Sequence, residues 1–544
     1  MVEAQRLMPR TLRRPPRAQA RRQTFTFGPF KGMRHLTDPT ASSEDHARLL
    51  RNCYTLDPHL NTRVVGRPGF ALIGAQLGTS GRRTPQWIGQ LTQLDGTRYT
   101  IAIVGGYVYT LNWSTEAWTE VLTDSDFSSA SITFSQTARV YAVTFANELV
   151  VSDGVNVPWS WDGTTNGGLT KLTNAPVFFG QPVVHFGKLM GIDAANRSDI
   201  QWSEENQANT GYDAGNYNNV WTLGQTDTDA LFRLAPSNEL LYVFRARSMT
   251  AIAGAVTPEF SSTGTREAIS STVGTTSPAC VFFEGNNIMF ADADGNPYLL
   301  PPGGTPISYW EYFSDTIEDL DPTKVTEMEG FWDPTLELSR ICFEDTAASA
   351  RSKQMLIHAG GTALSPDISY AAAVFDGYEF SRIGVVENAS GAPRVLHADV
   401  NGFLYVHGTR HGSTWDDNGD AIQHEVLSHY VAYSEDVEWH WDRLDFVFVS
   451  TTDLTDLVFT TTTPYGDSDS ITVSDPAGFA LWDEAVWDTD AWVNNANIGH
   501  NAIGVDAYGY YCVVRLQHST ASERFGLLGM KLRGEVVGSF PEMP

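Results

Sequence analysis

The chain has 544 residues, of which 42% are hydrophobic and 12% aromatic, enough for a large core divided between two or three domains. Its formal net charge is −28, which argues against a nucleic-acid-binding body, because binding to phosphates requires Lys and Arg. No apolar run reaches about 18 residues and no apolar signal core opens the chain, so neither a membrane-spanning helix nor a secretory signal is expected.

Residues 1–23 are predicted to form an extended basic arm. Residues 1–22 hold seven arginines and one acid, Glu3, a side-chain charge of +6 that leaves −34 on the other 522 residues. Three prolines prevent a continuous helix, which argues against a mitochondrial presequence. A disordered tail and an arm that docks on an acidic neighbour or touches DNA both fit. The arginines expected to bind a partner are Arg6, Arg10, Arg13, Arg14, Arg17, Arg21 and Arg22.

Residues 24–81 are predicted to be a lead-in segment with a short helix and the first strands. Thr24–Phe27 has the alternation of a short strand. Ser43–Cys53 has the composition of a helix of about two to three turns, with Ser43 as its N-cap. Arg67 is expected at a tight turn between two strands, and we count it among the partner-binding residues.

The order of motifs in this segment resembles a known family. A glycine-rich opening precedes Leu50-Arg51-Asn52, and an extended stretch then closes on Gly66-Arg67-Pro68-Gly69-Phe70, ahead of a strand-rich region. This order is similar to that of the tail hub, or nozzle, proteins of short-tailed bacteriophages and related phage tail components. The resemblance covers residues 24–81 by motif and 82–540 by layout only.

A short pattern recurs through residues 101–407. Each copy is a turn of Gly, Asn or Glu residues, followed by alternating apolar residues and a polar break. From turn to turn the spacings are 42, 40, 51, 48 and 115 residues, and Gln354–Ile357 is a poor copy inside the long gap. A strand-only period of roughly 40–50 residues is typical of β-propeller blades. The clear turns begin at Gly105, Asn147, Gly187, Asn238, Asn286 and Asn401.

We therefore predict an all-β chain, with a β-propeller of six or seven blades over residues 82–410, a C-terminal β-sandwich and the basic N-terminal arm. Small sheets that stack around an axis bury both faces and leave only short edges, which a single small sheet cannot do. The alternative is a run of unrelated β-meanders, or two sandwiches that share turn chemistry.

Residues 411–544 are predicted to form the sandwich. Val437–Trp441 and Leu444–Val449 have the pattern of half-buried antiparallel strands. A Trp-Asp…Trp-Asp…Trp loop follows, which is also similar to the phage tail hub proteins. Its rings could stack on a sugar, but packing against the sandwich fits better. They recur every five residues, at Trp482, Trp487 and Trp492.

Patterns that could carry chemistry are weak. Gly-x-Ser-x-Gly, His-Glu-x-x-His and the P-loop are absent, so we expect no catalytic residue. Asp292–Asn296 and Asp416–Asp420 place oxygen atoms at calcium-ligand steps, but both lack the Gly and Glu of an EF-hand, and turn chemistry explains them. The four cysteines have no zinc spacing and are expected to be buried free thiols in a reducing cytoplasm, without cofactor or metal: Cys53, Cys280, Cys342 and Cys512.

With the resemblance, these patterns predict a structural, non-enzymatic virion protein. As the resemblance implies, about six copies form a ring that extends the channel below the portal and tail adaptor. An acidic channel repels DNA phosphates, so viral DNA could pass without specific binding. The expected partners are other copies of the chain, the portal or adaptor and other tail proteins. The expected location is the virion tail, assembled in the bacterial host cytoplasm.

Two alternatives belong to other classes. A propeller whose mouth holds paired acids could bind or hydrolyse glycans as a receptor-recognition protein. Sialidase-like propellers repeat a Ser-x-Asp-x-Gly-x-Thr-Trp turn, whereas Ser152–Asn156 breaks that spacing and is not repeated. A monomeric propeller that acts as a protein adaptor is the other alternative.

Overall fold

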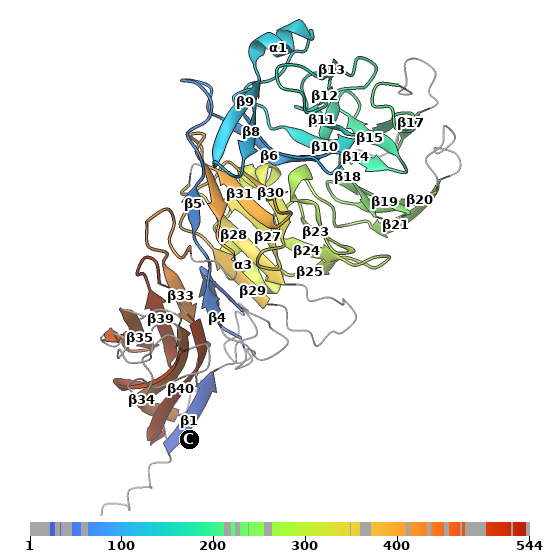
Figure 1. Cartoon of the computed structure of the whole chain (residues 1–544). Coiled ribbons are helices and arrows are strands. Elements are labelled where there is room, and N and C mark those ends of the chain that lie inside the picture. Colours follow the sequence, from blue (N-terminus) through green and yellow to red (C-terminus); the bar gives the residue numbers. More distant parts are fainter. Residues whose placement is uncertain are drawn as a thin grey trace, which may run out of the picture.

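The computed structural model consists almost entirely of strands (Figure 1). It describes residues 22–27, 33, 46–55, 64–210, 219–223, 229–237, 239–254, 264–348, 350–358, 371–409, 414–431, 437–450, 456–467, 470–473, 497–523 and 526–539. Small sheets form the larger part of the molecule, and two sheets with longer strands form a second part beside it. No helix in these ranges is long and apolar enough to cross a membrane.

Seven sets of four antiparallel strands follow one another through the larger part, within the described residues. The first set is β6 (Pro85–Thr92), β7 (Arg98–Val104), β8 (Tyr107–Asn112) and β9 (Ala117–Leu122), followed by helix α1 (Asp124–Ser129). The second is β10 (Tyr141–Phe145), β11 (Glu148–Ser152), β12 (Trp159–Trp161) and β13 (Leu169–Lys171). The third is β14 (Phe178–His185), β15 (Lys188–Asp193), β16 (Asp199–Trp202) and β17 (Val220–Thr222).

The remaining sets have the same plan. The fourth is β18 (Leu231–Ser237), β19 (Leu240–Arg245), β20 (Met249–Ala253) and β21 (Thr265–Ser270). The fifth, after the 3₁₀ turn Pro278–Cys280, is β22 (Phe282–Glu284), β23 (Asn287–Ala291), β24 (Pro297–Leu300) and β25 (Ile307–Ser308). Helix α3 (Trp310–Glu318) and the 3₁₀ helix Pro322–Glu327 lead to the sixth, β26 (Glu329–Asp333), β27 (Leu338–Glu344), β28 (Arg351–His358) and β29 (Ala371–Phe375). The seventh is β30 (Arg382–Glu387), β31 (Pro393–Ala398), β32 (Leu404–His407) and β5 (Phe70–Leu72).

Apolar cores between successive sheets hold the sets together. Between the first two sets, for example, Val108 packs in one cluster with Trp159 and Trp161, and similar clusters lie between the later pairs. The last set also packs on the first, because Leu404 shares a cluster with Ile88. Burial of both faces of each sheet explains the apolar alternation along the strands. The predicted all-β, propeller-like fold is confirmed at this level.

The seventh set is completed by a strand from near the start of the chain. In β5, Phe70 lies opposite His407 of β32. In β30, at the opposite edge of the same set, Arg382 Nε donates to the Gln86 carbonyl of β6 at 3.1 Å. The first and last sets of the described chain are therefore in direct contact. Strand β5, from near the start of the described chain, completes a sheet whose other three strands come much later.

The repeated turns are hairpins, but not equivalent ones. The turns at Asn147, Gly187 and Asn286 join the first two strands of their sets. Those at Gly105 and Asn401 join the second strand to the third. The last copy is therefore one hairpin later in its set, which lengthens the final spacing beyond two periods.

The second part consists of two sheets packed face to face. The first has the order β3 (Cys53–Thr55), β4 (Val64–Gly66), β40 (Gly526–Ser539), β34 (Val437–Ser450) and β38 (Asn497–Gly509), with β1 (Arg22–Phe27) also on β40. The second has the order β2 (Leu49–Arg51), β33 (His424–Leu427), β39 (Val513–His518), β35 (Leu457–Thr463) and β36 (Gly466–Asp467), with β37 (Ile471–Val473) also on β35. The Phe446 and Phe459 rings, 4.3 Å apart between centroids, meet between the two sheets.

Two sequence predictions need correction here. The helix over Ser43–Cys53 is wrong in its described part, because Leu49–Arg51 is strand β2 and Cys53 opens strand β3. Leu50 and Cys53 are fully buried between neighbouring strands, and strand pairing outweighs the weak helical pattern. Val437–Trp441 and Leu444–Val449 are one strand, β34, whose register shifts between them. Thr24–Phe27 lies in β1, as predicted.

Candidate functional site

Of the eight arginines predicted to bind a partner, two lie in the described part of the chain. Arg6, Arg10, Arg13, Arg14, Arg17 and Arg21 lie outside it. Arg22 begins β1, and its side chain is 62% exposed, with Asp442 at 3.5 Å and Glu535 at 3.6 Å. Arg67, in contrast, is 2% exposed. The prediction that Arg67 binds a partner is therefore replaced by an internal role.

The guanidinium of Arg67 is held by groups from three distant parts of the chain. Its two terminal nitrogens donate to the Asp417 carboxylate at 2.7 and 2.5 Å, and Nε donates to Asn52 Oδ1 at 2.9 Å. Nη2 also donates to the Asp376 carbonyl at 3.3 Å. Burial opposes the charge of Arg67, yet the hydrogen bonds and charge of Asp417 raise its pKa above the ordinary value. The result is a buried, bidentate ion pair.

Asn52 connects this pair to its surroundings. Its φ of 55° is left-handed, a conformation that Asn adopts more readily than most residues. Its amide nitrogen donates to Asp376 Oδ1 and to the Gln423 carbonyl, both at 2.9 Å. Its amide oxygen accepts from Arg67 Nε and from the Asp376 backbone N–H, each at 2.9 Å. Every polar group of the side chain is thus engaged, with the residue after β4, the residue after β29 and the residue before β33.

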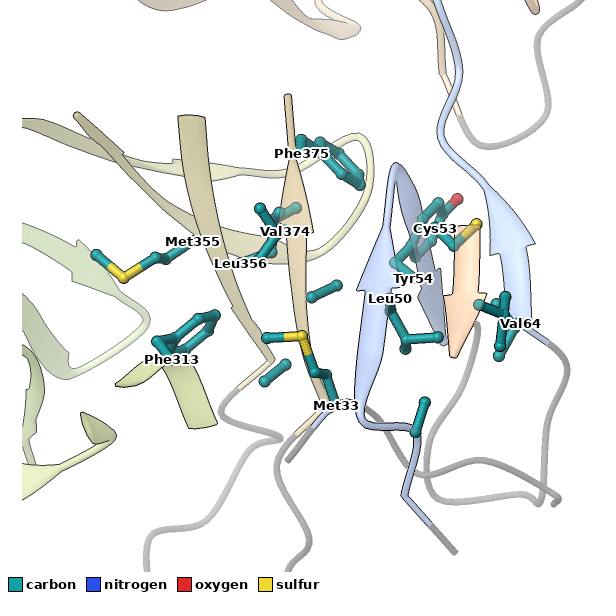
Figure 2. Close-up of a cluster of buried hydrophobic side chains, with 14 of the residues drawn as sticks. Met33, Leu50, Cys53, Tyr54, Val64, Phe313, Met355, Leu356, Val374 and Phe375 are labelled. Atoms are coloured by element: carbon teal, nitrogen blue, oxygen red, sulfur yellow. The ribbon is translucent and has the colours of Figure 1, made fainter. Parts of the chain in front are cut away.

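Strand β2 also connects the sixth set to the sandwich, through backbone pairing. Leu50 pairs with Val426 of β33, and Arg51 pairs in parallel with Val374 of β29, so the sixth set and the second sandwich sheet form one sheet of ten strands. Figure 2 shows Leu50 on one side of the strand that bears Val374, and Met355 on the other. One apolar cluster therefore runs from the sixth set into the sandwich. We call the Arg67–Asn52–Asp376–Asp417 network and strand β2 together the joint.

A cavity of about 680 Å³ opens beside the joint. Its lining includes Leu49, Val374 and Leu427 as apolar wall, and four basic groups with carboxylate or hydroxyl partners. Lys353 Nζ lies 2.5 Å from Asp319 and 3.0 Å from Asp345. The other three are Arg51 with Asp376 at 2.8 Å, Arg515 with Glu425 at 3.0 Å, and Arg48 with the Tyr430 hydroxyl at 2.9 Å.

The basic groups that line this cavity are held by partners within the chain. Burial opposes the charge of Lys353, but hydrogen bonds to Asp319 and Asp345 raise its pKa, so it stays a cation. A lysine kept charged by two carboxylates is a poor general base.

The two acidic turns show turn chemistry. Asp292 Oδ1 accepts from the backbone N–H groups of Asp294 and Asn296, both at 2.9 Å. Asp416 Oδ1 accepts from the Gly419 N–H at 2.7 Å. Asn418 and Asp420 belong to the same turn as Asp417, the partner of Arg67. Within the described ranges, no three His, Cys, Asp or Glu side chains are grouped as metal ligands.

The four cysteines are buried and free, as predicted. Burial raises the pKa of Cys280 to about 12, and it raises the pKa of the other three thiols as well. A thiol with a raised pKa is a weak nucleophile. The cysteines therefore serve as apolar core residues.

The three tryptophans of the predicted Trp-Asp loop, Trp482, Trp487 and Trp492, lie outside the described residues.

A pair of buried histidines lies next to the joint. His397 Nδ1 and His407 Nε2 are 2.8 Å apart, so one neutral ring donates to the other. Phe70 packs edge-on against His397 at 4.6 Å between ring centroids. Burial, with smaller contributions from the charges of Arg67 and Arg340, lowers the pKa of His397 to about 3. Burial also lowers the pKa of His407 well below its ordinary value.

We expect this pair to make the fold sensitive to acid. The folded-state pKa values lie below the unfolded value of about 6.5, so the unfolded chain binds more protons below that pH. Stability is therefore complete above about pH 6.5 and falls as the pH drops toward the folded-state values, by about 2 kcal/mol per histidine at pH 5. Urea unfolding between pH 7 and pH 5 measures this loss.

The matched control for this prediction replaces both rings with a side chain that does not titrate. His397→Gln/His407→Gln should lose stability more slowly with falling pH than the wild type, although His424 and His185 keep lowered pKa values in both. Equal pH dependence in the two proteins would show that this pair does not contribute.

Sequence reasoning missed most of the joint. Asp376 and Asp417 are ordinary acidic residues in the sequence, and the turn that contains Asp417 is explained there by turn chemistry alone. One feature of the sequence did point to the joint: Arg67 stands between Gly66 and Pro68, with apolar strand patterns on both sides. Gly and Pro favour turns. An arginine at a turn between two strands can therefore be enclosed by neighbouring strands.

No family model matches the chain, and no curated protein matches it. Partly similar solved structures include PorZ, a surface component of the type-IX secretion system of Porphyromonas gingivalis, with 10% identity and a TM-score of 0.37. That match covers 66% of this chain and 42% of PorZ, so the chain spans less than half the length of PorZ. Virginiamycin B lyase from Staphylococcus aureus matches with 10% identity and a TM-score of 0.37, over 62% of this chain and 98% of the lyase.

The N-terminal domain of Nup159 is similar in the same partial way, with 12% identity and a TM-score of 0.36 over 66% of this chain and 98% of that domain. TM-scores and identities this low carry no argument about fold or function. The fold described above therefore rests on the strand pairing and packing of this chain alone, and the function rests on its residues.

Proposed function

We propose that this chain is a structural subunit of a short-tailed bacteriophage tail, a hub or nozzle protein without enzymatic activity. About six copies form a ring around the DNA channel, below the portal and adaptor. The seven sets of strands close into a seven-bladed propeller that forms the body of each subunit. The sandwich supplies contacts to neighbouring subunits or to the next tail component.

The observation that carries the proposal is the meeting of the two motifs on which the resemblance rests. Asn52 of Leu50-Arg51-Asn52 and Arg67 of Gly66-Arg67-Pro68-Gly69-Phe70 are hydrogen-bonded at 2.9 Å. Both lie at the joint, and Phe70 opens the strand that completes the seventh set. The shared motif thus has one physical task in this chain, which is to fix the sandwich on the propeller-like body.

Charge supports the same proposal. The chain outside residues 1–22 carries a formal charge of −34. A ring of such subunits presents negative charge to its channel, and DNA phosphates are repelled from such a wall rather than bound. The basic arm of residues 1–22 has the opposite sign, so it is attracted to the acidic surface of a neighbouring copy or tail protein. The arm therefore links one component of the tail to the next.

Native mass spectrometry of the purified chain tests the proposal. We expect a mass near six copies of the 59.8 kDa chain. A deletion of residues 1–22 should lower the assembled fraction, because it removes seven positive charges that bind an acidic neighbour. A variant with these arginines replaced by Gln keeps the arm's length and serves as the control for charge.

The possible outcomes test the formation of the ring and the role of the arm separately. A single chain at every concentration would contradict the ring. Equal assembly with and without residues 1–22 would leave the ring in place and contradict the role of the arm. Assembly lost by the deletion but kept by the Gln variant would assign the arm's contribution to its length rather than its charge.

A further inference from the structure

Four buried arginines gather where strands of several sets begin. Arg233 lies in β18, Arg382 opens β30, Arg351 opens β28, and Arg139 precedes β10 by two residues. Their side chains are between 5% and 13% exposed. We call these four residues the arginine cluster. They come from the second, fourth, sixth and seventh sets, which brings distant parts of the sequence to one place.

The cluster lies in the interior between the sets rather than at one boundary. Arg139 of the second set forms an ion pair with Glu329 of the sixth set at 3.1 Å, although these sets are not neighbours along the chain. Arg351 lies 3.7 Å from the same carboxylate. Arg382 of the seventh set donates to the Gln86 carbonyl of the first set. One set of contacts therefore crosses the middle of the propeller-like body.

Positive charge exceeds negative charge in this place. Within the described residues, the carboxylates paired with the cluster are Glu329 and Glu327, and Glu327 is 52% exposed. No carboxylate of the described chain lies within 4.0 Å of Arg233 or Arg382. Four guanidinium groups thus share two carboxylates, one of which is half in solvent.

Two guanidinium groups of the cluster crowd one acceptor and two others each have a nitrogen that lacks a partner, although Arg351 also donates through Nε to the Glu327 carbonyl at 2.9 Å. Arg351 and Arg382 both donate through Nη1 to one acceptor, the Ser381 carbonyl, at 2.5 and 2.7 Å, which places two like charges side by side. Arg233 is 7% exposed, and its Nε has no hydrogen-bond partner. Its Nη1 makes one long bond, 3.4 Å to the Gln181 carbonyl. Arg139 Nη1 also has no hydrogen-bond partner.

Such an arrangement is costly unless a further negative charge is present. A guanidinium does not release its proton in a protein, so it cannot escape the cost of burial by becoming neutral. Burial, together with the neighbouring positive charge of Arg139, lowers the pKa of Arg382 to about 9. Burial also lowers the pKa of Arg233 to about 10. Both groups therefore lie where an anion would be stabilised.

Arg139 is the one positive neighbour that acts on both Arg233 and Arg382. We propose that the arginine cluster binds one small oxyanion of the phosphate class beside Arg139. Guanidinium forks match the oxygen geometry of phosphate and sulfate. A buried site excludes a polymer, so the ligand is a free ion rather than a nucleic-acid phosphate. The anion ties four sets of strands together at the middle of the body.

Isothermal titration calorimetry of the full chain with inorganic phosphate tests this site, at an ionic strength held constant with chloride. We expect saturable binding by the wild type. Arg233→Gln and Arg382→Gln should each bind roughly tenfold or more weakly, the size expected for the loss of a charge-assisted hydrogen bond. Arg98→Gln is the matched control, since Arg98 is 41% exposed and paired with Glu387 at 3.0 Å; it should bind like the wild type.

Several results would overturn the proposal. These are no saturable binding by the wild type, or equal affinity in Arg233→Gln, Arg382→Gln and the control. If both variants fail to fold, thermal unfolding of the wild type decides, and equal midpoints in phosphate and chloride would refute the site. A short single-stranded oligonucleotide should not displace phosphate; displacement by it would refute the free ion and assign the site to nucleic-acid phosphates.

Discussion

Arg67→Ala is expected to lower the free energy of unfolding by about 3–5 kcal/mol, the cost of removing one partner from a buried ion pair. Asp417 would lose its ionic partner with a side chain only 11% exposed, and Asn52 would lose one of its hydrogen bonds. Arg67→Lys should rescue little, because an ammonium cannot reproduce the bidentate fork and the bond to Asn52 together. Urea unfolding, followed through the 15 tryptophans, measures the loss.

Two comparisons isolate the pair. Arg22→Ala removes an arginine whose ion pairs lie on the surface, so its effect should stay within about 0.5 kcal/mol. Asp417→Ala and the double variant complete a double-mutant cycle, in which the double variant should be less destabilised than the sum of the single ones. If Arg67→Ala unfolded at the same urea concentration as Arg22→Ala, the stabilising role of the joint would be contradicted.

Removal of β5 is expected to have an effect at least as large. A fragment of residues 82–422 leaves the edge of β32 unpaired and lacks the Phe70 ring, which is 6% exposed in the full chain. Loss of that buried ring alone is expected to cost about 3–5 kcal/mol. The open strand edge also invites association with other chains. We therefore expect lower urea midpoints and aggregation on size-exclusion chromatography.

The matched fragment is residues 68–422, which keeps β5 together with the segment after it, whose Ile73 and Leu77 pack in one cluster with Leu404. Gly69 should also matter in it, because a Cβ at that position would lie 1.8 Å from the Asp416 carbonyl oxygen. Gly69→Ala in the longer fragment should therefore approach the behaviour of the shorter one. Equal unfolding midpoints for the two fragments would show that β5 does not seal the seventh set.

Much of the fold could be predicted from the sequence because its main features are local. Alternating apolar residues and hairpin turns depend on neighbours within a few positions, and they indicated small sheets repeated along the chain. The turns could not be aligned correctly, since Gly105 and Asn147 have the same chemistry but join different strands of their sets. Turn chemistry specifies a reversal of the chain, and the place of that reversal within a sheet depends on packing.

The joint and the arginine cluster could not be predicted, because both are assembled across long sequence distances. Arg67 and Asp417 are 350 residues apart, and no local pattern marks Asp417 as a partner. Leu49–Arg51 is a strand only because β29 and β33 border it on both sides. Its own composition favours a helix, and tertiary pairing overrides that weak preference.

Electron microscopy of the purified full chain tests the central claim most directly. The account predicts rings of about six copies around an open channel, each copy a closed propeller with the sandwich fixed to it. The channel wall in such a reconstruction should carry more acidic than basic side chains. Separate single chains at every concentration, or rings whose channel is lined mainly by arginine and lysine, would contradict the account.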